Sequence, residues 1–70
     1  MKIQITIQNE FGEFLGEVLE VSVEQYSQII ELSRNFYNQG FELVCENGDF
    51  TIFPPEIVKK SILKIVIKSK

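Results

Sequence analysis

The sequence contains no histidine and no tryptophan, and its 70 residues include a single cysteine, Cys45. Without histidine, the chain lacks the commonest general base at neutral pH and the commonest metal ligand. One thiol cannot form an internal disulfide, and alone it cannot build a structural zinc site. Cys45 has no evident activating neighbour, and it alternates with Phe41 and Leu43, which predicts a small buried side chain. We therefore expect a protein that is not an enzyme and that binds no cofactor or metal.

Other motifs and long apolar segments are also missing. The four glycines are scattered and form no phosphate-binding loop, and the spacing of the acids matches no calcium loop. No apolar run approaches the roughly 18 residues that a membrane span requires, and the N-terminus has no run of signal-peptide length. An unpaired cysteine suits a reducing compartment. These absences predict a soluble cytoplasmic protein, in the host cytoplasm if a phage encodes it, with no membrane partner.

Cations are scarce except near the C-terminus. Residues 1–58 carry all ten acids against only Lys2 and Arg34, a net charge of −8, whereas residues 59–70 carry the other five of the seven cations and no acid. Two interpretations are open. Either the basic segment lies beside acidic neighbours in the fold, or it forms an interaction surface.

The first 21 residues predict a β-hairpin. Residues 2–8 alternate strictly, with Ile3, Ile5 and Ile7 on an inward face and polar side chains such as Gln4 and Thr6 on the outward face. Residues 9–12 favour a turn, and residues 13–21 predict a second strand. Apolar side chains fall on both faces of that strand, so we expect a bulge at its glycine, residue 16.

A helix is predicted to follow. Ser22 and Gln25 fit a capping box, and Gly40 supplies a stop signal. The helix should turn one apolar face toward the sheet. That face contains Val23, Tyr26, Ile29, Ile30, Ser33, Phe36 and Tyr37.

Three further strands complete the predicted fold. Residues 41–46 and 49–53 flank an Asn-Gly turn, which is a strong hairpin signal. Pro54 and Pro55 end the second of these strands, and residues 55–60 favour one helical turn. Residues 62–68 alternate, with Leu63, Ile65 and Ile67 inward. We therefore predict a single α+β domain, residues 1–70, with two layers: one helix packed on a mostly antiparallel sheet in the order ββαββ, a short turn, then β.

Two groups of residues are candidate interaction sites. A ligand or partner site is predicted at Phe53, Pro54, Pro55, Lys59, Lys60, Ser61 and Lys64. A protein interface is predicted at Glu13, Phe14, Glu17, Ile62 and Val66. Lysines 60, 64, 68 and 70, with residue 59 adjoining, form a basic ridge that suits nucleic acid or a small anion such as a nucleotide phosphate. The same lysines are better interpreted as guards against pairing at an edge strand, because no aromatic residues for base stacking alternate with them.

The small size of the chain favours self-association. A domain of 70 residues buries only roughly 60% of the surface that its unfolded form exposes. Disulfides and metals are unavailable as stabilising cross-links, so burial of further surface in a homo-oligomer would compensate for the small core. We therefore expect a homo-oligomer that also binds a host protein or a small anionic nucleotide.

Two segments, NEFGEFLGEVLEVS and GDFTIFPPEIVKKSILKI, belong to a short acidic chain rich in isoleucine, lysine, glutamate and asparagine. In this style the chain resembles the small accessory proteins, of anti-defence type, carried by bacteriophages and prophages of low-GC Gram-positive bacteria. The resemblance implies a stoichiometric binder: either an inhibitor of a bacterial defence or host protein, or an oligomeric sponge for a signalling nucleotide. The alternatives are a small nucleic-acid-binding regulator that uses the basic ridge and a structural subunit of a larger assembly.

Overall fold

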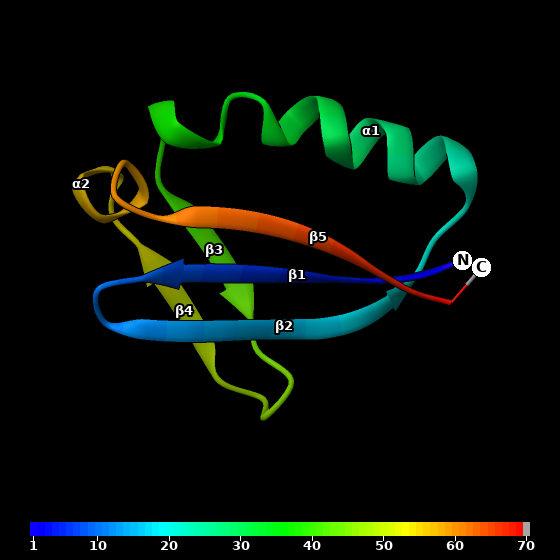
Figure 1. Cartoon of the computed structure of the whole chain (residues 1–70), viewed down its shortest axis with the longest axis horizontal. Helices are drawn as coiled ribbons and strands as arrows, with labels where there is room; N and C mark the ends of the chain where they lie inside the picture. The colour runs from blue at the N-terminus through cyan, green and yellow to red at the C-terminus, as the bar shows by residue number, and fades with distance from the viewer. Residues whose placement is uncertain (70) are drawn as a thin grey trace.

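The strands and helices follow one another in the predicted order, which confirms the α+β class (Figure 1). A computed structural model describes residues 1–69, and Lys70 of the basic ridge lies outside the described residues. The elements are β1 (Lys2–Asn9), β2 (Gly12–Glu20), α1 (Val23–Ser33), the 3-10 helix η1 (Phe36–Asn38), β3 (Phe41–Val44), β4 (Phe50–Phe53), α2 (Pro55–Val58) and β5 (Ile62–Ser69).

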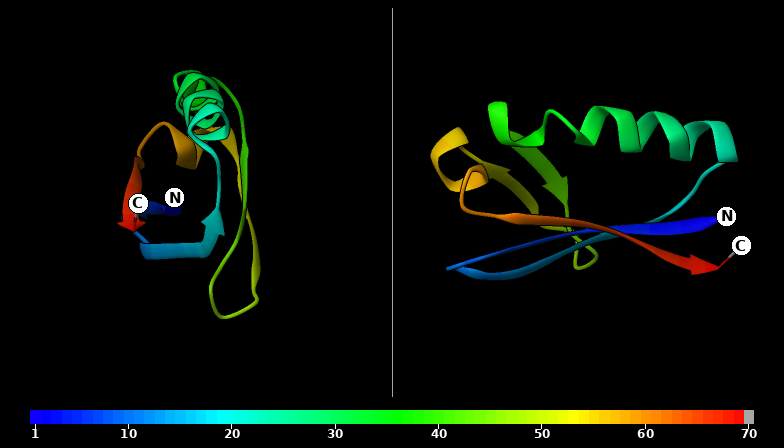
Figure 2. Two further views of the ribbon diagram at one scale, coloured as in Figure 1. Left: turned by 90° about the vertical axis from the view of Figure 1, so that its right-hand side faces the viewer. Right: turned by 45° about the horizontal axis from the view of Figure 1, so that its top comes forward.

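The strands form two antiparallel sheets. Strand β1 lies in the centre of a three-stranded sheet of order β2-β1-β5, and β3 and β4 form a separate hairpin. Within residues 1–69, backbone pairing between the two sheets occurs at one place, where Gly16 of β2 forms a single bridge with Cys45 and the amide of Glu46 donates to the carbonyl of Leu15 at 2.9 Å. Figure 2 shows the hairpin standing beside the sheet on the side of β2.

The predicted bulge in β2 is present and has a clear steric reason. Gln4 of β1 pairs with Val18 and Thr6 pairs with Leu15, so β2 holds an extra residue between these pairs. At this point a Cβ on Gly16 would lie 2.8 Å from the carbonyl oxygen of Ile5 and 2.9 Å from Cδ1 of Leu43. A side chain there would push the hairpin away from the sheet, and glycine removes that obstacle.

The predictions for the two hairpin turns and for the start of each helix are confirmed. Gly12 and Gly48 adopt positive φ angles of 128° and 92° in the two hairpin turns, a conformation that glycine adopts without steric cost. Ser22 and Gln25 form the reciprocal capping box of α1. Pro55 occupies the start of α2, where its missing amide hydrogen leaves no hydrogen bond unmade.

The core lies between the inward face of the sheet, the hairpin, η1 and α2. Its buried members are Ile7, Phe36, Leu43, Cys45, Phe53 and Val58. Aromatic rings meet edge to face within it, since Phe14 packs on Phe53 and Phe41 packs on Phe36, each pair at 5.1 Å between ring centroids. Cys45 is buried, as predicted, and its Sγ lies within hydrogen-bonding distance of the Thr51 hydroxyl, at 3.6 Å.

The helix differs from its prediction in length and in burial. It ends at Ser33 rather than near Gly40, and none of its residues is fully buried. Val23 is 71% exposed although it was predicted to face the sheet. Only Phe36 of the predicted face is fully buried, and it lies beyond the helix in η1. The predicted packing of a helix layer on the sheet is therefore not established, because α1 contributes no fully buried side chain.

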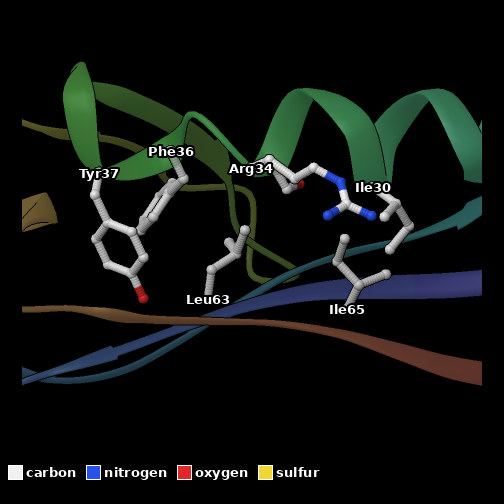
Figure 3. A pocket seen from close by; sticks show the side chains of 7 residues that line it. Ile30, Arg34, Phe36, Tyr37, Leu63 and Ile65 are labelled. Atoms are coloured by element: carbon white, nitrogen blue, oxygen red, sulfur yellow. The ribbon is translucent and has the colours of Figure 1, made fainter.

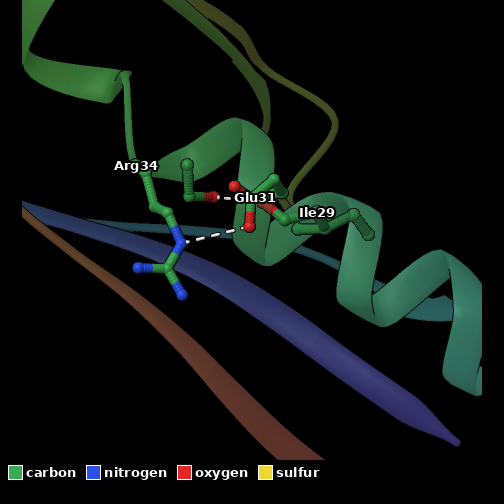
Figure 4. Close-up of polar contacts among 4 residues, drawn as sticks. Ile29, Glu31 and Arg34 are labelled. Carbon is green, nitrogen blue, oxygen red and sulfur yellow. Dashed lines mark hydrogen bonds and ion pairs between the residues drawn. The ribbon is translucent and has the colours of Figure 1, made fainter.

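Local hydrogen bonds accompany the early end of α1 (Figure 4). The hydroxyl of Ser33 donates to the carbonyl of Ile29 at 2.7 Å, a back-bond that slightly weakens a helix. At the C-cap Arg34 and the next residue, the backbone amides donate to the carbonyls of Glu31 and Leu32, each at 3.3 Å. These bonds span three residues rather than four, as in a last turn that tightens into a 3-10 helix. The chain then enters η1 and carries Phe36 into the core.

Two expectations about exposure on the sheet are also wrong. Gln4 and Thr6 lie on the outward face of β1, yet each is only 4% exposed, because β1 is the central strand. Gln4 is satisfied there by hydrogen bonds from its Nε2 to the carbonyl of Gly16 at 2.8 Å and to Glu46 at 3.1 Å. Ile67 was placed inward but is 43% exposed, since it lies close to the end of β5, away from the core cluster.

Candidate functional site

Two residues of the predicted ligand site have structural roles. Phe53 is in the core, where it packs on Phe14. Ser61 is 3% exposed, and its hydroxyl donates to the carbonyl of Ile57 at 2.7 Å and lies 3.1 Å from the donating Nδ2 of Asn9. These bonds fix α2 and the following turn against the end of β1, so this hydroxyl is already engaged within the fold.

The other members of that predicted site lie in separate places. Pro54 and Pro55 line an open hollow of about 520 Å³, within the size range of a small-ligand cleft, whose wall also contains Phe53, Gly40 and Glu42 but no lysine. Lysines 59, 60 and 64 are exposed. The structure therefore does not gather the seven residues around one cavity.

The predicted protein interface is brought together in part. Glu13 and Ile62 both pair with Gln8 of β1, one from each side, so the three side chains share the outward face of the sheet. Val66 pairs with Gln4 on the same face. Phe14 instead faces the core, and Glu17 lies on the exposed side of the bulge. The outward face thus joins three of the five predicted residues.

A second apolar surface, which the prediction did not include as a site, lies on the hairpin. Val44, Phe50 and Ile52 share one face of β3 and β4, where Val44 pairs with Phe50, and they are 44%, 61% and 68% exposed. We term these three residues the hairpin surface. The opposite face of the same hairpin holds the buried Leu43 and Phe53. Both faces of this two-stranded element are therefore apolar, and the core covers only one of them.

The hairpin surface has an acidic surrounding. Residues 41–53 carry Glu42, Glu46 and Asp49 and no cation. Glu42 pairs with Ile52 and so lies on the hairpin surface itself. At the free side of β4, Ile52 also lines a small hollow with Phe11, an aromatic side chain that is 68% exposed. The apolar residues are thus continuous with an exposed aromatic ring and bordered by negative charge.

The sequence contains a signal for this surface. Val44 and Ile52 alternate with buried residues in two strands that are apolar at nearly every position. A strand with apolar side chains on both faces needs a cover on each face. A 70-residue chain with one 11-residue helix has little left to provide the second cover.

A groove of about 400 Å³ separates α1 from β5 (Figure 3). Ile30 and Arg34 point down from the helix, and Leu63 and Ile65 point up from the strand. The guanidinium of Arg34 lies 3.2 Å from the Glu31 carboxylate (Figure 4). Both side chains are largely exposed, so the pair contributes little to stability.

That ion pair is the only one within residues 1–69. The described lysines of the basic ridge therefore have no acidic partner within salt-bridge distance. This finding does not support the interpretation that the basic segment is neutralised by acidic neighbours in the fold. Negative charge instead gathers on β2 and the hairpin, whereas positive charge lies along β5, at the other edge of the three-stranded sheet.

Within the described part of the chain, no three acidic or thiol side chains are placed to hold a metal ion. Neither α1 nor α2, the helices of that part, is long and apolar enough to cross a bilayer. Comparison of the chain with protein-family models, with curated proteins and with solved structures found no match. Its surfaces are thus the main guide to its function.

Proposed function

We propose that this chain is a non-catalytic binding protein whose hairpin surface docks on a basic protein and inhibits it stoichiometrically. In the phage context that the sequence style implies, the target is a bacterial defence or host factor. The observation that carries the proposal is the exposed cluster of Val44, Phe50 and Ile52 on an element that carries only acidic charge. The proposal needs no reactive group, which suits a chain without histidine.

The composition of the hairpin surface defines the partner. Large side chains that are adjacent and exposed are typical of an interaction site. Burying a Phe or Ile side chain contributes roughly 1.5–3 kcal/mol, so Phe50 and Ile52 are suited to be central anchors. Glu42 and Asp49 border these anchors, and an acidic border steers binding toward a positively charged surface. The expected partner therefore presents an apolar centre within a basic rim.

A second form of the proposal is an oligomeric sponge for a signalling nucleotide. It is supported by lysines 59, 60 and 64, which are exposed and have no ion-pair partner within residues 1–69. Its weakness is that Ser61 is engaged internally and that the hollow beside Pro54 and Pro55 has no lysine in its wall. Light scattering, with calorimetry against cyclic dinucleotides and ADP-ribose derivatives, tests this form. A monomer that binds none of these compounds excludes it.

The inhibitor form is tested by recovering the partner from native host cells with a tagged chain. Native mass spectrometry should find a complex of fixed stoichiometry. The variant Val44→Thr/Phe50→Thr/Ile52→Thr should lose the partner, because it removes the apolar anchors but leaves every charge unchanged. Val23→Thr/Leu32→Thr is the matched control, because these side chains of α1 are 71% and 73% exposed. Equal recovery with the hairpin variant and the wild-type chain would exclude the hairpin surface as the interface.

A further inference from the structure

Strand β5 presents a free sheet edge. Seven of its eight residues pair with β1 on one side, Lys68 falls at a register shift, and no strand within residues 1–69 pairs with the other side. Figure 2 shows β5 as the outermost strand of the sheet, opposite the side where the hairpin stands. Every second residue of an edge strand presents unpaired backbone donors and acceptors, which can accept an added strand.

The outward face of this edge alternates between apolar and positively charged side chains. Ile62 and Val66 are 55% and 37% exposed, and Lys64 lies between them in the same unbroken register with β1. Lys68 lies beyond them, at a shift in that register. Neither lysine has an acidic partner within the described residues. An added strand would place its own side chains beside Ile62, Lys64 and Val66. The edge therefore favours a strand that alternates apolar and acidic residues on one face.

Charge also decides against the simplest self-association. Two copies of β5 that paired around a two-fold axis would bring the same lysines together, and like charges across strands are destabilising. The acids of β2 do not neutralise the edge within one molecule, because β2 and β5 flank opposite sides of β1. An acidic strand from another protein meets neither obstacle.

We propose that the free edge of β5 binds an extended acidic segment of a partner protein by strand addition, with Lys64 selecting its carboxylates. Backbone hydrogen bonds to the edge provide the affinity, and the alternating side chains provide the specificity. This site is separate from the hairpin surface and carries the opposite charge. It therefore holds whether or not the hairpin surface proves to be an inhibitor interface.

A synthetic peptide tests the site directly. The probe is a capped peptide of eight residues, the length of β5. Along one face of the extended peptide, glutamate and valine alternate, and every residue of the other face is threonine. Fluorescence anisotropy should show binding to the wild-type chain that weakens as salt is raised, since salt screens exposed charges. Hydrogen exchange should show new protection of amides in β5. A peptide with lysine in place of glutamate should not bind.

The matched variants are Lys64→Glu and Lys59→Glu, which change the net charge equally. Lys64→Glu should raise the dissociation constant about fivefold or more, because it turns a cross-strand attraction into a repulsion. Lys59 is the C-cap of α2, outside the edge, and its variant should stay within about twofold of the wild-type chain. Circular dichroism must show that both variants are folded. Lys64→Gln removes the charge without reversing it, so its dissociation constant should lie between those of the wild-type chain and Lys64→Glu.

Three results would overturn the proposal. Absence of peptide binding at low salt would leave the lysines as guards of the edge strand. Binding of single-stranded DNA at the same lysines, tighter than the acidic peptide, would assign the edge to nucleic acid. A mass above the monomer that falls to the monomer in Lys64→Glu would assign the edge to a second copy of this chain.

Discussion

The substitution Gly16→Ala tests how the two sheets are joined. Gly16 is the point where β2 meets the hairpin, and its carbonyl also accepts the bond from Gln4 at 2.8 Å. A new Cβ would lie 2.8 Å from the Ile5 carbonyl oxygen and 2.9 Å from Leu43 Cδ1. The backbone oxygen belongs to the central strand, so β2 must shift to relieve that contact, and the hairpin or the Leu43 side chain must shift to relieve the other. Overpacking of this kind costs about 1–3 kcal/mol.

That cost is large for so small a domain. At roughly 0.05–0.15 kcal/mol per residue, the total free energy of unfolding is on the order of 4–10 kcal/mol. Each kcal/mol lost should lower the melting temperature by about 4–8 °C. Urea unfolding followed by circular dichroism measures the loss, and the slope of free energy against urea should stay unchanged.

A double variant and a control sharpen the test. Leu43→Val shortens the one obstructing side chain, so Gly16→Ala/Leu43→Val should lose less than the sum of the single losses. Gly40→Ala is the control, because its Cβ would lie 3.0 Å from the Phe53 carbonyl oxygen and meets no second close atom. A loss below about 0.5 kcal/mol for Gly16→Ala, or a larger loss for Gly40→Ala, would refute the reasoning.

Three further substitutions or probes test other parts of the fold. Phe36→Ala should cost about 3–5 kcal/mol of folding free energy and largely unfold the chain. Tyr37→Ala should cost far less, because its side chain is 46% exposed. Equal melting temperatures of the two variants would show that Phe36 is not central to the core. Ser22→Ala should cost about 1 kcal/mol of the local stability of α1. Amide hydrogen exchange should become faster in α1 while the amides of β1 stay protected. Equally faster exchange in both elements would contradict the weak coupling of the helix to the core. The thiol of Cys45 should react with a disulfide reagent only as fast as the chain opens, because it is 7% exposed, and reaction as fast as a free thiol in native buffer would contradict its burial.

Local signals in the sequence predicted most of the fold. The capping box, the Asn-Gly turn, the bulge at Gly16 and the proline at the start of α2 each depend on a few neighbouring residues. The order and class of the elements followed from them. The errors arose where distant parts of the chain decide the outcome. Gln4 is buried because β1 became the central strand, and α1 ends early because Phe36 enters the core from η1.

The candidate sites were harder to predict for a related reason. Alternation in a strand shows that Ile62 and Val66 lie outward, and this proved correct. It does not show which of two apolar faces the core will cover. Phe53 and Phe14 were therefore assigned to sites although both pack in the core, while Val44 and Ile52 were left out although they are exposed. Only the three-dimensional placement of β3 and β4 beside β2 separates the two groups.

The central claim is that this chain acts by occupying its partner rather than by changing it chemically. Titration of the purified host partner with the chain measures this directly. The partner's activity should fall linearly to an end point at a fixed integral ratio, and the variant Val44→Thr/Phe50→Thr/Ile52→Thr should have no effect at that ratio. Progressive loss of partner activity at ratios far below one chain per partner would contradict the claim, because it would reveal turnover.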